Sequence, residues 1–190
     1  MFTGSMMING ALAVPSWTTL ESGDWLGDTA SFTLGSGTLT ANAVDKNVRT
    51  ALTVVSASQD FDFEITGGAF GTNNGPYMGF YDNGTTAGTT KPTETDDIVT
   101  IENGGATPGY EHNGDTTDTG GGKSAGFMAS VVVRLSRRGS TFYAYLDDVL
   151  DHTYADVTGT AAGGFYVGCG GGGSGFSFST MRYRLGPGLP

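Results

Sequence analysis

Residues Phe127–Asp148, FMASVVVRLSRRGSTFYAYLDD, contain two apolar runs joined by a short polar connection. Along both runs apolar side chains recur at every second position, which is the period of a β-strand. Gly139 in the connection can take the positive φ that a tight reversal needs. A second short connection, Asp147-Asp148, precedes the further short run Val149–Tyr154. The stretch therefore predicts an antiparallel meander of three strands.

The same alternation of apolar and polar residues occurs on both sides of the meander, and no segment has sustained helical spacing. The further strands that we expect are Ala30–Leu34, Thr38–Ala43, Val48–Val55, Asp60–Thr66, Pro76–Asp82, Asp97–Glu102, Gly109–His112 and Gly164–Cys169. Phe32, Leu34 and Leu39 are the inward residues expected in the first pair. The pattern predicts an all-β chain of about a dozen strands in two packed sheets.

The last apolar run changes phase partway along its length. Phe176 and Phe178 share one parity, whereas the apolar residues between Met181 and Leu185 share the other. A β-bulge near Ser179-Thr180 would reconcile the two parities, because a bulge adds one residue to one strand of a pair.

Length and composition favour one domain over residues 1–190, with an irregular segment at 1–16 and long Gly/Thr/Asp-rich loops within 83–126. The 33 glycines indicate many tight turns, and the 11 Phe, 8 Tyr and 2 Trp provide material for a packed core. Cys169 is the single cysteine, so no internal disulfide can form and we expect a buried thiol.

Charge excludes some partners. The net charge of −10 repels the phosphates of nucleic acid and anionic membrane surfaces. No apolar stretch approaches the ~20 residues of a membrane span, so we expect no membrane insertion. The N-terminal apolar run lacks a basic region and is interrupted by Asn9 and Gly10, so it is not a convincing signal peptide.

Together these segments resemble the concanavalin A-like lectin/glucanase superfamily. The residues that carry the resemblance are DFDFEI (60–65), YMGFY (77–81), VRL (133–135), RG (138–139), FYAYLD (142–147), GFYVG (164–168) and GFSF (175–178). The resemblance implies a jelly-roll sandwich of two antiparallel sheets, with a concave sheet that often binds saccharide. One departure is Asp148, which stands where many relatives have Gly.

In the glucanases of that superfamily the catalytic carboxylates lie on one strand as Glu-x-Asp-x-Glu, and the nearest equivalent here is Asp60, Asp62 and Glu64. Alternate residues of a strand are ~6.6 Å apart at the backbone. A retaining glycosidase needs two carboxyl groups about 5–5.5 Å apart, so the spacing permits catalysis. The same residues also fit the polar, solvated face of an antiparallel strand, or a cation or sugar site.

Four tyrosines are the candidate ligand-binding residues, namely Tyr77, Tyr81, Tyr143 and Tyr145. Each lies opposite the expected core residues of its strand, and aromatic rings on a concave sheet can stack on sugar rings. Cross-strand aromatic packing or a subunit interface would explain the same pattern.

Asp115 and Asp118 offer the hard oxygen ligands that calcium prefers, in the segment NGDTTDTG. Their spacing is not that of an EF-hand, and a solvated loop explains them equally. His112 and His152 have no partner at metal-ligand spacing. We therefore expect no cofactor other than calcium.

Two classes of function fit the sequence. The first is a non-enzymatic structural or adhesive module of a larger particle, such as a bacteriophage capsid decoration, fibre or tail protein. Its partners would be copies of itself, other particle proteins and glycans, and it would lie at the virion surface or outside the cell. The alternative is a carbohydrate-binding lectin-like domain or a glycoside hydrolase of the glucanase type.

Overall fold

The computed structural model describes residues 14–43, 46–50, 59–67, 76–81, 97–103, 108–112, 115–119, 131–139, 141–154, 164–169 and 176–186. Only the backbone is described for residues 76, 77, 81, 97–103, 108–112, 115–119, 154, 164 and 169. The end of the expected strand Val48–Val55, from residue 51, lies outside these ranges, as does the side chain of Cys169.

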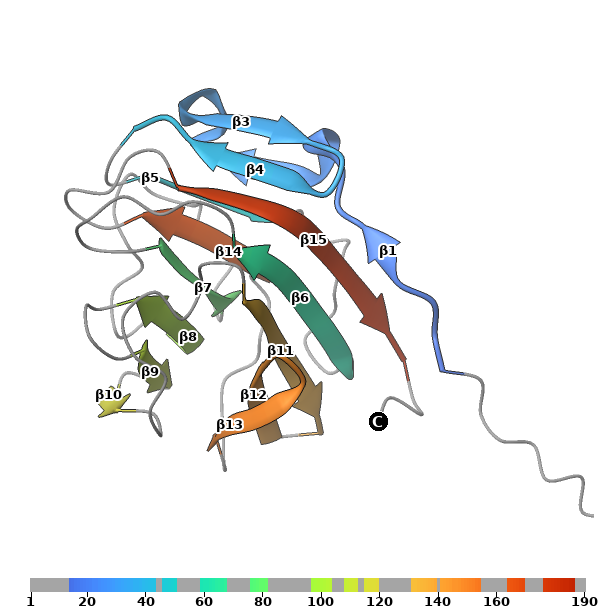
Figure 1. Cartoon of the computed structure of the whole chain (residues 1–190), viewed down its shortest axis with the longest axis vertical. Coiled ribbons are helices and arrows are strands. Elements are labelled where there is room, and N and C mark those ends of the chain that lie inside the picture. The colour runs from blue at the N-terminus through green and yellow to red at the C-terminus, as the bar shows by residue number, and fades with distance from the viewer. Residues whose placement is uncertain are drawn as a thin grey trace, which may run out of the picture.

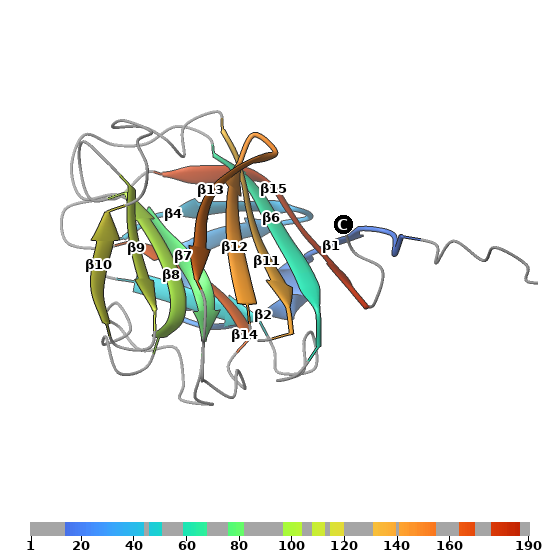
Figure 2. The ribbon, with the colours of Figure 1, turned by 90° about the horizontal axis from the view of Figure 1, so that it is seen from below.

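The described strands form two antiparallel sheets that pack face to face (Figures 1 and 2). Sheet A has the order β13 (Val149–Tyr154), β12 (Thr141–Leu146), β11 (Val132–Arg138), β6 (Phe61–Gly67), β15 (Ser177–Leu185), β4 (Thr38–Ala41) and β3 (Phe32–Gly35), and β1 (Thr18–Thr19) also pairs with β15. Sheet B has the order β10 (Asp115–Thr119), β9 (Pro108–His112), β8 (Asp97–Asn103), β7 (Pro76–Tyr81), β14 (Gly164–Cys169), β5 (Lys46–Thr50) and β2 (Trp25–Gly27). Two single-turn 3₁₀ helices, η1 (Ser22–Asp24) and η2 (Thr29–Ser31), flank β2.

The predicted meander is confirmed as β11, β12 and β13, which pair in sequence order. Gly139 has a φ of 60° in the first connection, as the tight reversal requires. In the second connection both Asp147 and Asp148 are left-handed, with φ of 50° and 62°. Two consecutive positive φ values are typical of the type I′ turn, whose twist matches that of the flanking strands.

The predicted bulge is confirmed in β15. The register with β6 shifts between Phe178, which pairs with Gly67, and Thr180, which pairs with Thr66. Because of the extra residue, both Phe178 and Met181 are buried although their positions differ in parity.

The core lies between the two sheets and consists mainly of phenylalanines. Phe61 of sheet A stacks on Phe80 of sheet B at 4.8 Å between ring centroids, and Phe63 stacks on Phe165 at 4.3 Å. Phe32 and Leu39 are buried as predicted, whereas Leu34 packs against the core from a partly buried position.

Three strands differ from the expectation. Asp115–Thr119 forms the edge strand β10 rather than a loop, and β1 and β2 are short strands in a segment for which the sequence predicted no pairing. Across the described ranges no helix is long and apolar enough to span a membrane.

Candidate functional site

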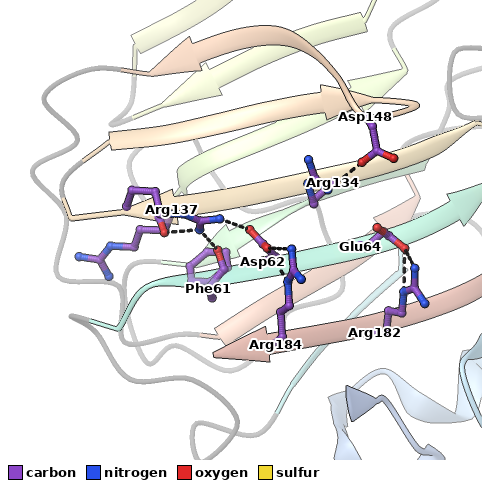
Figure 3. Close-up of polar contacts among 9 residues, drawn as sticks. Phe61, Asp62, Glu64, Arg134, Arg137, Asp148, Arg182 and Arg184 are labelled. Carbon is purple, nitrogen blue, oxygen red and sulfur yellow. Dashed lines mark hydrogen bonds and ion pairs between the residues drawn. The ribbon is translucent and has the colours of Figure 1, made fainter. Parts of the chain in front are cut away.

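The outward side of sheet A carries a band of charged and aromatic side chains, which we call the outer face of sheet A. It arises because Phe61, Phe63 and Ile65 of β6 point into the core, so that the intervening residues point outward. The same alternation applies to β11, β12 and β15. The band comprises Trp17, Asp62, Glu64, Arg134, Ser136, Arg138, Tyr143, Tyr145, Arg182 and Arg184 (Figure 3 labels part of it).

Register arranges most of these residues in two rows that cross the strands. One row runs from β15 to β12 through Arg182, Glu64, Arg134 and Tyr145. The neighbouring row, one pleat away, runs through Arg184, Asp62, Ser136 and Tyr143. Strands from three distant parts of the sequence therefore bring arginine, carboxylate and tyrosine side by side.

Asp62 is the centre of this network and is 0% exposed. Its Oδ1 accepts a hydrogen bond from Nη2 of Arg138 at 2.7 Å. Its Oδ2 accepts one from Nε of Arg184 at 2.7 Å and lies 2.7 Å from Nη2 of the same arginine. Two arginines thus offset the cost of removing this carboxylate from water.

Glu64 is also buried, at 5% exposure, and its Oε1 lies 2.7 Å from Nε and 2.6 Å from Nη2 of Arg182. Arg134, its neighbour on β11, pairs instead with the exposed Asp148 of the turn at 2.7 Å. Figure 3 shows Glu64 joined to Arg182 of β15, and Arg134 of β11 joined to Asp148 instead.

The expectation that this carboxylate face is solvated is wrong for Asp62 and Glu64. The reason is that arginines of β11 and β15 lie against the two carboxylates and shield them from water. The third residue, Asp60, precedes β6 and accepts a hydrogen bond from the backbone of Gly139 at 2.8 Å.

The network also bears on the catalytic alternative. A glycosidase nucleophile attacks through a carboxylate oxygen that faces the sugar. Both oxygens of Asp62 accept hydrogen bonds from arginines, so attack would first require loss of one of these contacts. The arrangement is suited to joining β6, β11 and β15.

Aromatic rings lie at both ends of the two rows. The guanidinium carbons of Arg182 and Arg184 lie 4.6 and 4.5 Å from the ring centre of Trp17. At the other end, the guanidinium of Arg134 lies 4.4 Å from the ring of Tyr145. Cation–π contacts of this kind hold both ring and guanidinium in place.

Tyr143 and Tyr145 occupy alternate outward positions of β12 and are half-buried. Their ring centroids are 6.4 Å apart, with 37° between the ring planes. Tyr77 and Tyr81 lie on β7 in sheet B, so the four tyrosines do not form one platform. The side chains of Tyr77 and Tyr81 are outside the described residues.

Asp115 and Asp118, the candidate calcium ligands, lie on the edge strand β10, where their side chains are not described. Among the side chains that are described, no group of three or more His, Cys, Asp or Glu could hold a metal ion.

Sequence reasoning missed the arginines and Trp17. The outward parity of Arg134, Arg182 and Arg184 relative to the apolar residues beside them was a signal for the arginines. For Trp17 no such signal existed, because its place over β15 depends on the pairing of Thr18 with Tyr183.

Next to the two rows, Arg137 lies on the inward parity of β11 near the end of the strand. Burial lowers the pKa of its guanidinium, and the charge of Asp60 opposes that shift. Its Nε donates a hydrogen bond to the carbonyl of Gly139 at 2.8 Å, which ties the guanidinium to the turn.

Comparison with known proteins gives matches of structure only. No protein-family model matches the sequence, and no curated protein matches it. The structure is similar to the carbohydrate recognition domain of Emp47p, with a TM-score of 0.51 and 11% identity over 90% of this chain and 88% of that one. It is also similar to the exoplasmic/lumenal domain of VIP36 bound to calcium and Man3GlcNAc, with a TM-score of 0.54 and 10% identity over 88% and 82% of the two chains.

A third similar structure is the sialidase of Trypanosoma rangeli in complex with 2,3-difluorosialic acid. Its TM-score is 0.56 and its identity 11%, over 81% of this chain but only 26% of the sialidase. The Emp47p and VIP36 domains, in contrast, align over most of their length. The two antiparallel sheets and these neighbours together show that the chain has the concanavalin A-like jelly-roll fold.

Proposed function

We propose that this domain binds saccharides through the outer face of sheet A and that Tyr143 and Tyr145 make the main contact. The observation that carries the proposal is the pair of half-buried rings on adjacent outward positions, 6.4 Å apart. A rigid, partly exposed aromatic pair offers apolar area to the C–H face of a sugar while its hydroxyl groups remain available for hydrogen bonds.

Two further observations support the proposal. The stacking of Arg134 on Tyr145 fixes one ring before any ligand arrives, which lowers the entropy cost of binding. The fold is shared with the VIP36 domain, which was solved with mannose oligosaccharides bound. The likeness to the VIP36 domain is one of fold alone, so the experiment tests the tyrosine pair directly.

The test is a glycan-array screen of the purified domain, followed by calorimetry with the saccharides that bind. Loss of both rings in Y143A/Y145A removes about 2 kcal/mol of contact energy, so the Kd should rise about 30-fold. The control is L26A, which truncates an exposed side chain on sheet B and should leave the Kd unchanged. An unchanged Kd in the double variant would reject the tyrosine pair as the site.

Calcium is tested in the same screen by adding and then chelating it. Loss of binding on chelation would show that binding requires calcium, and Asp115 and Asp118 would be the first candidate ligands. Binding that persists with chelator would show that the outer face of sheet A acts without metal.

The alternative is a glycoside hydrolase of the glucanase type that uses Asp60, Asp62 and Glu64. It is tested by incubating the domain with β-glucans and measuring new reducing ends. Hydrolysis that disappears in Glu64→Gln would favour the enzyme over the binding domain.

Placement on a bacteriophage particle, with copies of itself or other particle proteins as partners, stays a prediction from the sequence. The similar structures named above lend it no support. A particle-surface domain that binds glycans would be compatible with the proposal, since the outer face of sheet A would serve in either location.

A further inference from the structure

We infer that Asp148 is a positioning residue for the tyrosine pair, because it holds Arg134 over the ring of Tyr145. This role rests on the proposed function and deepens it, since it assigns part of that site to a residue of the neighbouring turn. Three observations carry it, namely a strained backbone position, an exposed ion pair and a cation–π contact, which together link the turn to the ring.

The backbone at Asp148 is strained in a way that the turn itself does not require. Its φ of 62° lies in the left-handed region, where a side chain comes too close to the following carbonyl oxygen. Glycine avoids this clash, and type I′ turns accordingly favour Asn or Asp followed by Gly. A glycine at this position would form the same turn with less strain. A strained residue that persists at such a position points to a use for its side chain.

Asp147, the other left-handed residue of the turn, already closes it. Its amide nitrogen donates a hydrogen bond to the carbonyl of Val132 at 2.8 Å, and its Oδ1 accepts one from the amide nitrogen of Val132 at 3.0 Å. These two bonds tie the turn to β11. The carboxylate of Asp148 instead accepts a hydrogen bond from a side chain on the outer face of sheet A, Nη1 of Arg134, at 2.7 Å.

The ion pair between Asp148 and Arg134 adds little to stability. The side chain of Asp148 is 76% exposed, and solvent and salt weaken exposed pairs of this kind. The pair therefore does little more than offset the strain of the turn. Its effect lies with the arginine, whose side chain is only 17% exposed and whose guanidinium carbon is 4.4 Å from the ring centre of Tyr145.

Arg134 has a second carboxylate within its row. In the register of sheet A it lies opposite Glu64 of β6 on one side and opposite Tyr145 of β12 on the other. Within the described residues its Nε is buried without a hydrogen-bond partner, so the bond to Asp148 and the stacking on Tyr145 fix the guanidinium. Asp148 thus draws the guanidinium toward the tyrosines and away from Glu64 (Figure 3).

Tyr145 also has a second neighbour on the outer face of sheet A. Leu150 of the edge strand β13 lies opposite it in register and is 51% exposed. A ring released by Arg134 would be free to pack on this apolar side chain and to leave its position 6.4 Å from the ring of Tyr143. Holding Tyr145 against Arg134 therefore preserves the spacing of the pair before a saccharide arrives.

Asp148→Gly should improve the turn and impair the site. Relief of strain should raise the Tm by about 2 °C. The Kd for mannobiose, cellobiose or any saccharide retained on the glycan array should rise about threefold in calorimetry, because Tyr145 loses its cation–π partner. Val149→Ala truncates the exposed residue that follows Asp148 and should leave the Kd unchanged. A lower Tm in Asp148→Gly would show that the side chain serves the turn itself and would overturn the inference.

Arg134→Lys tests whether Asp148 acts through Arg134. Lysine keeps the positive charge but lacks the planar group that stacks on a ring. The Kd should rise about threefold in Arg134→Lys, and adding Asp148→Gly should cause no further loss. Losses that multiply in the double variant would mean that Asp148 contacts the saccharide directly, and the positioning role would then be wrong.

NMR spectroscopy tests the link from Asp148 to Tyr145 without any ligand. The ring of Tyr145 should shift the proton signals of the Arg134 side chain upfield, because the guanidinium lies over its face. This shift should shrink in Asp148→Gly, and in the parent protein it should shrink in about 1 M salt, which screens the ion pair. Signals of Arg134 that stay in place in Asp148→Gly would overturn the inference, whether or not a saccharide binds.

The two proposals can fail separately. If no saccharide binds, the proposed function fails and the role of Asp148 in binding fails with it. If saccharides bind and the Kd is the same in Asp148→Gly as in the parent protein, the proposed function stands and this inference is overturned. A higher Kd together with a higher Tm and a smaller Arg134 shift would support both.

Discussion

Asp62 contributes more to the stability of sheet A than its position on the outward face of a strand would suggest. A carboxylate on such a face is usually solvated, and its ion pairs contribute little. Here the side chain is fully buried and pairs with Arg138 from β11 and Arg184 from β15. The outward face is therefore held by charge-assisted hydrogen bonds, while the inward face is held by aromatic packing.

Asp62→Asn should lower the free energy of unfolding by about 3 kcal/mol, because two partly buried arginines lose a fully buried counter-charge. The measurement is urea unfolding followed by tryptophan fluorescence. Asp148→Asn is the matched control, since its ion pair with Arg134 is exposed and should contribute about 0–1 kcal/mol. Equal losses in the two variants would contradict the distinction between the buried and the exposed pair.

Tyr183 should make stability depend on pH in the alkaline range. It lies on the inward parity of β15, 6.2 Å from the ring of Phe165, and burial and then the charge of Asp24 raise its pKa above 10.0. The folded state therefore holds this proton more tightly than the unfolded state. The resulting stabilisation is complete below pH 10 or so and is lost as pH rises through the folded pKa.

Tyr183→Phe removes that titration, so its unfolding midpoint in urea should fall less between pH 9 and pH 11 than that of the parent protein. Tyr143→Phe serves as the control, because it removes a phenol from the outer face of sheet A instead. If the urea midpoint of the parent protein falls no more steeply with pH than that of Tyr183→Phe, ionisation of Tyr183 does not affect stability.

At the scale of single elements, the bulge in β15 decides which side chains face outward. The extra residue at Ser179 allows Phe178 and Met181 both to be buried, and it leaves Arg182 and Arg184 on the outer face. Deleting Ser179 should preserve these directions, because Phe178 and Thr180 would then alternate regularly. Inserting an alanine between Thr180 and Met181 should reverse them and drive both arginines toward the core.

The deletion variant should therefore fold cooperatively, whereas the insertion variant should be insoluble or lack a cooperative transition. Circular dichroism during thermal unfolding distinguishes the two. If both variants fold equally well, the bulge does not set the register of β15.

Sequence alone was sufficient for elements whose signal is local. The meander at 131–154 follows from alternation and two short turns, and the bulge follows from a change of parity within one run. Which strands become neighbours is not a local property. The network on Asp62 depends on β6 lying between β11 and β15, which are distant in the sequence, so the arginines that bury this carboxylate could not be assigned.

At the scale of the whole molecule, the last strand occupies the middle of a sheet. β15 lies between β6 on one side and β4 and β1 on the other. Sheet A therefore cannot be completed until nearly the whole chain is available. Non-local pairing of this kind is expected to make folding slow, in the range of milliseconds to seconds.

Removing residues 177–190 should accordingly abolish cooperative unfolding, since β6 loses its neighbour and the core loses Phe178 and Met181. A synthetic peptide of residues 176–190, added to the truncated chain, should restore it. The matched control is the same peptide with Met181→Asp, which should fail because a charge would enter the core. A truncated chain with an unchanged transition would show that β15 is dispensable.

The pairing of β1 with β15 also has a mechanical consequence. Thr18 lies opposite Tyr183 and Thr19 opposite Arg182, so the chain arrives and departs at the same corner of the sandwich, where Pro15 lies beside Gly186. A pulling force applied through residues 15 and 186 would open this antiparallel pair one hydrogen bond at a time, as a zipper opens, instead of shearing all its bonds together. The same closeness would let the domain be spliced into a surface loop of a host protein, or be circularly permuted, with only a short connecting segment.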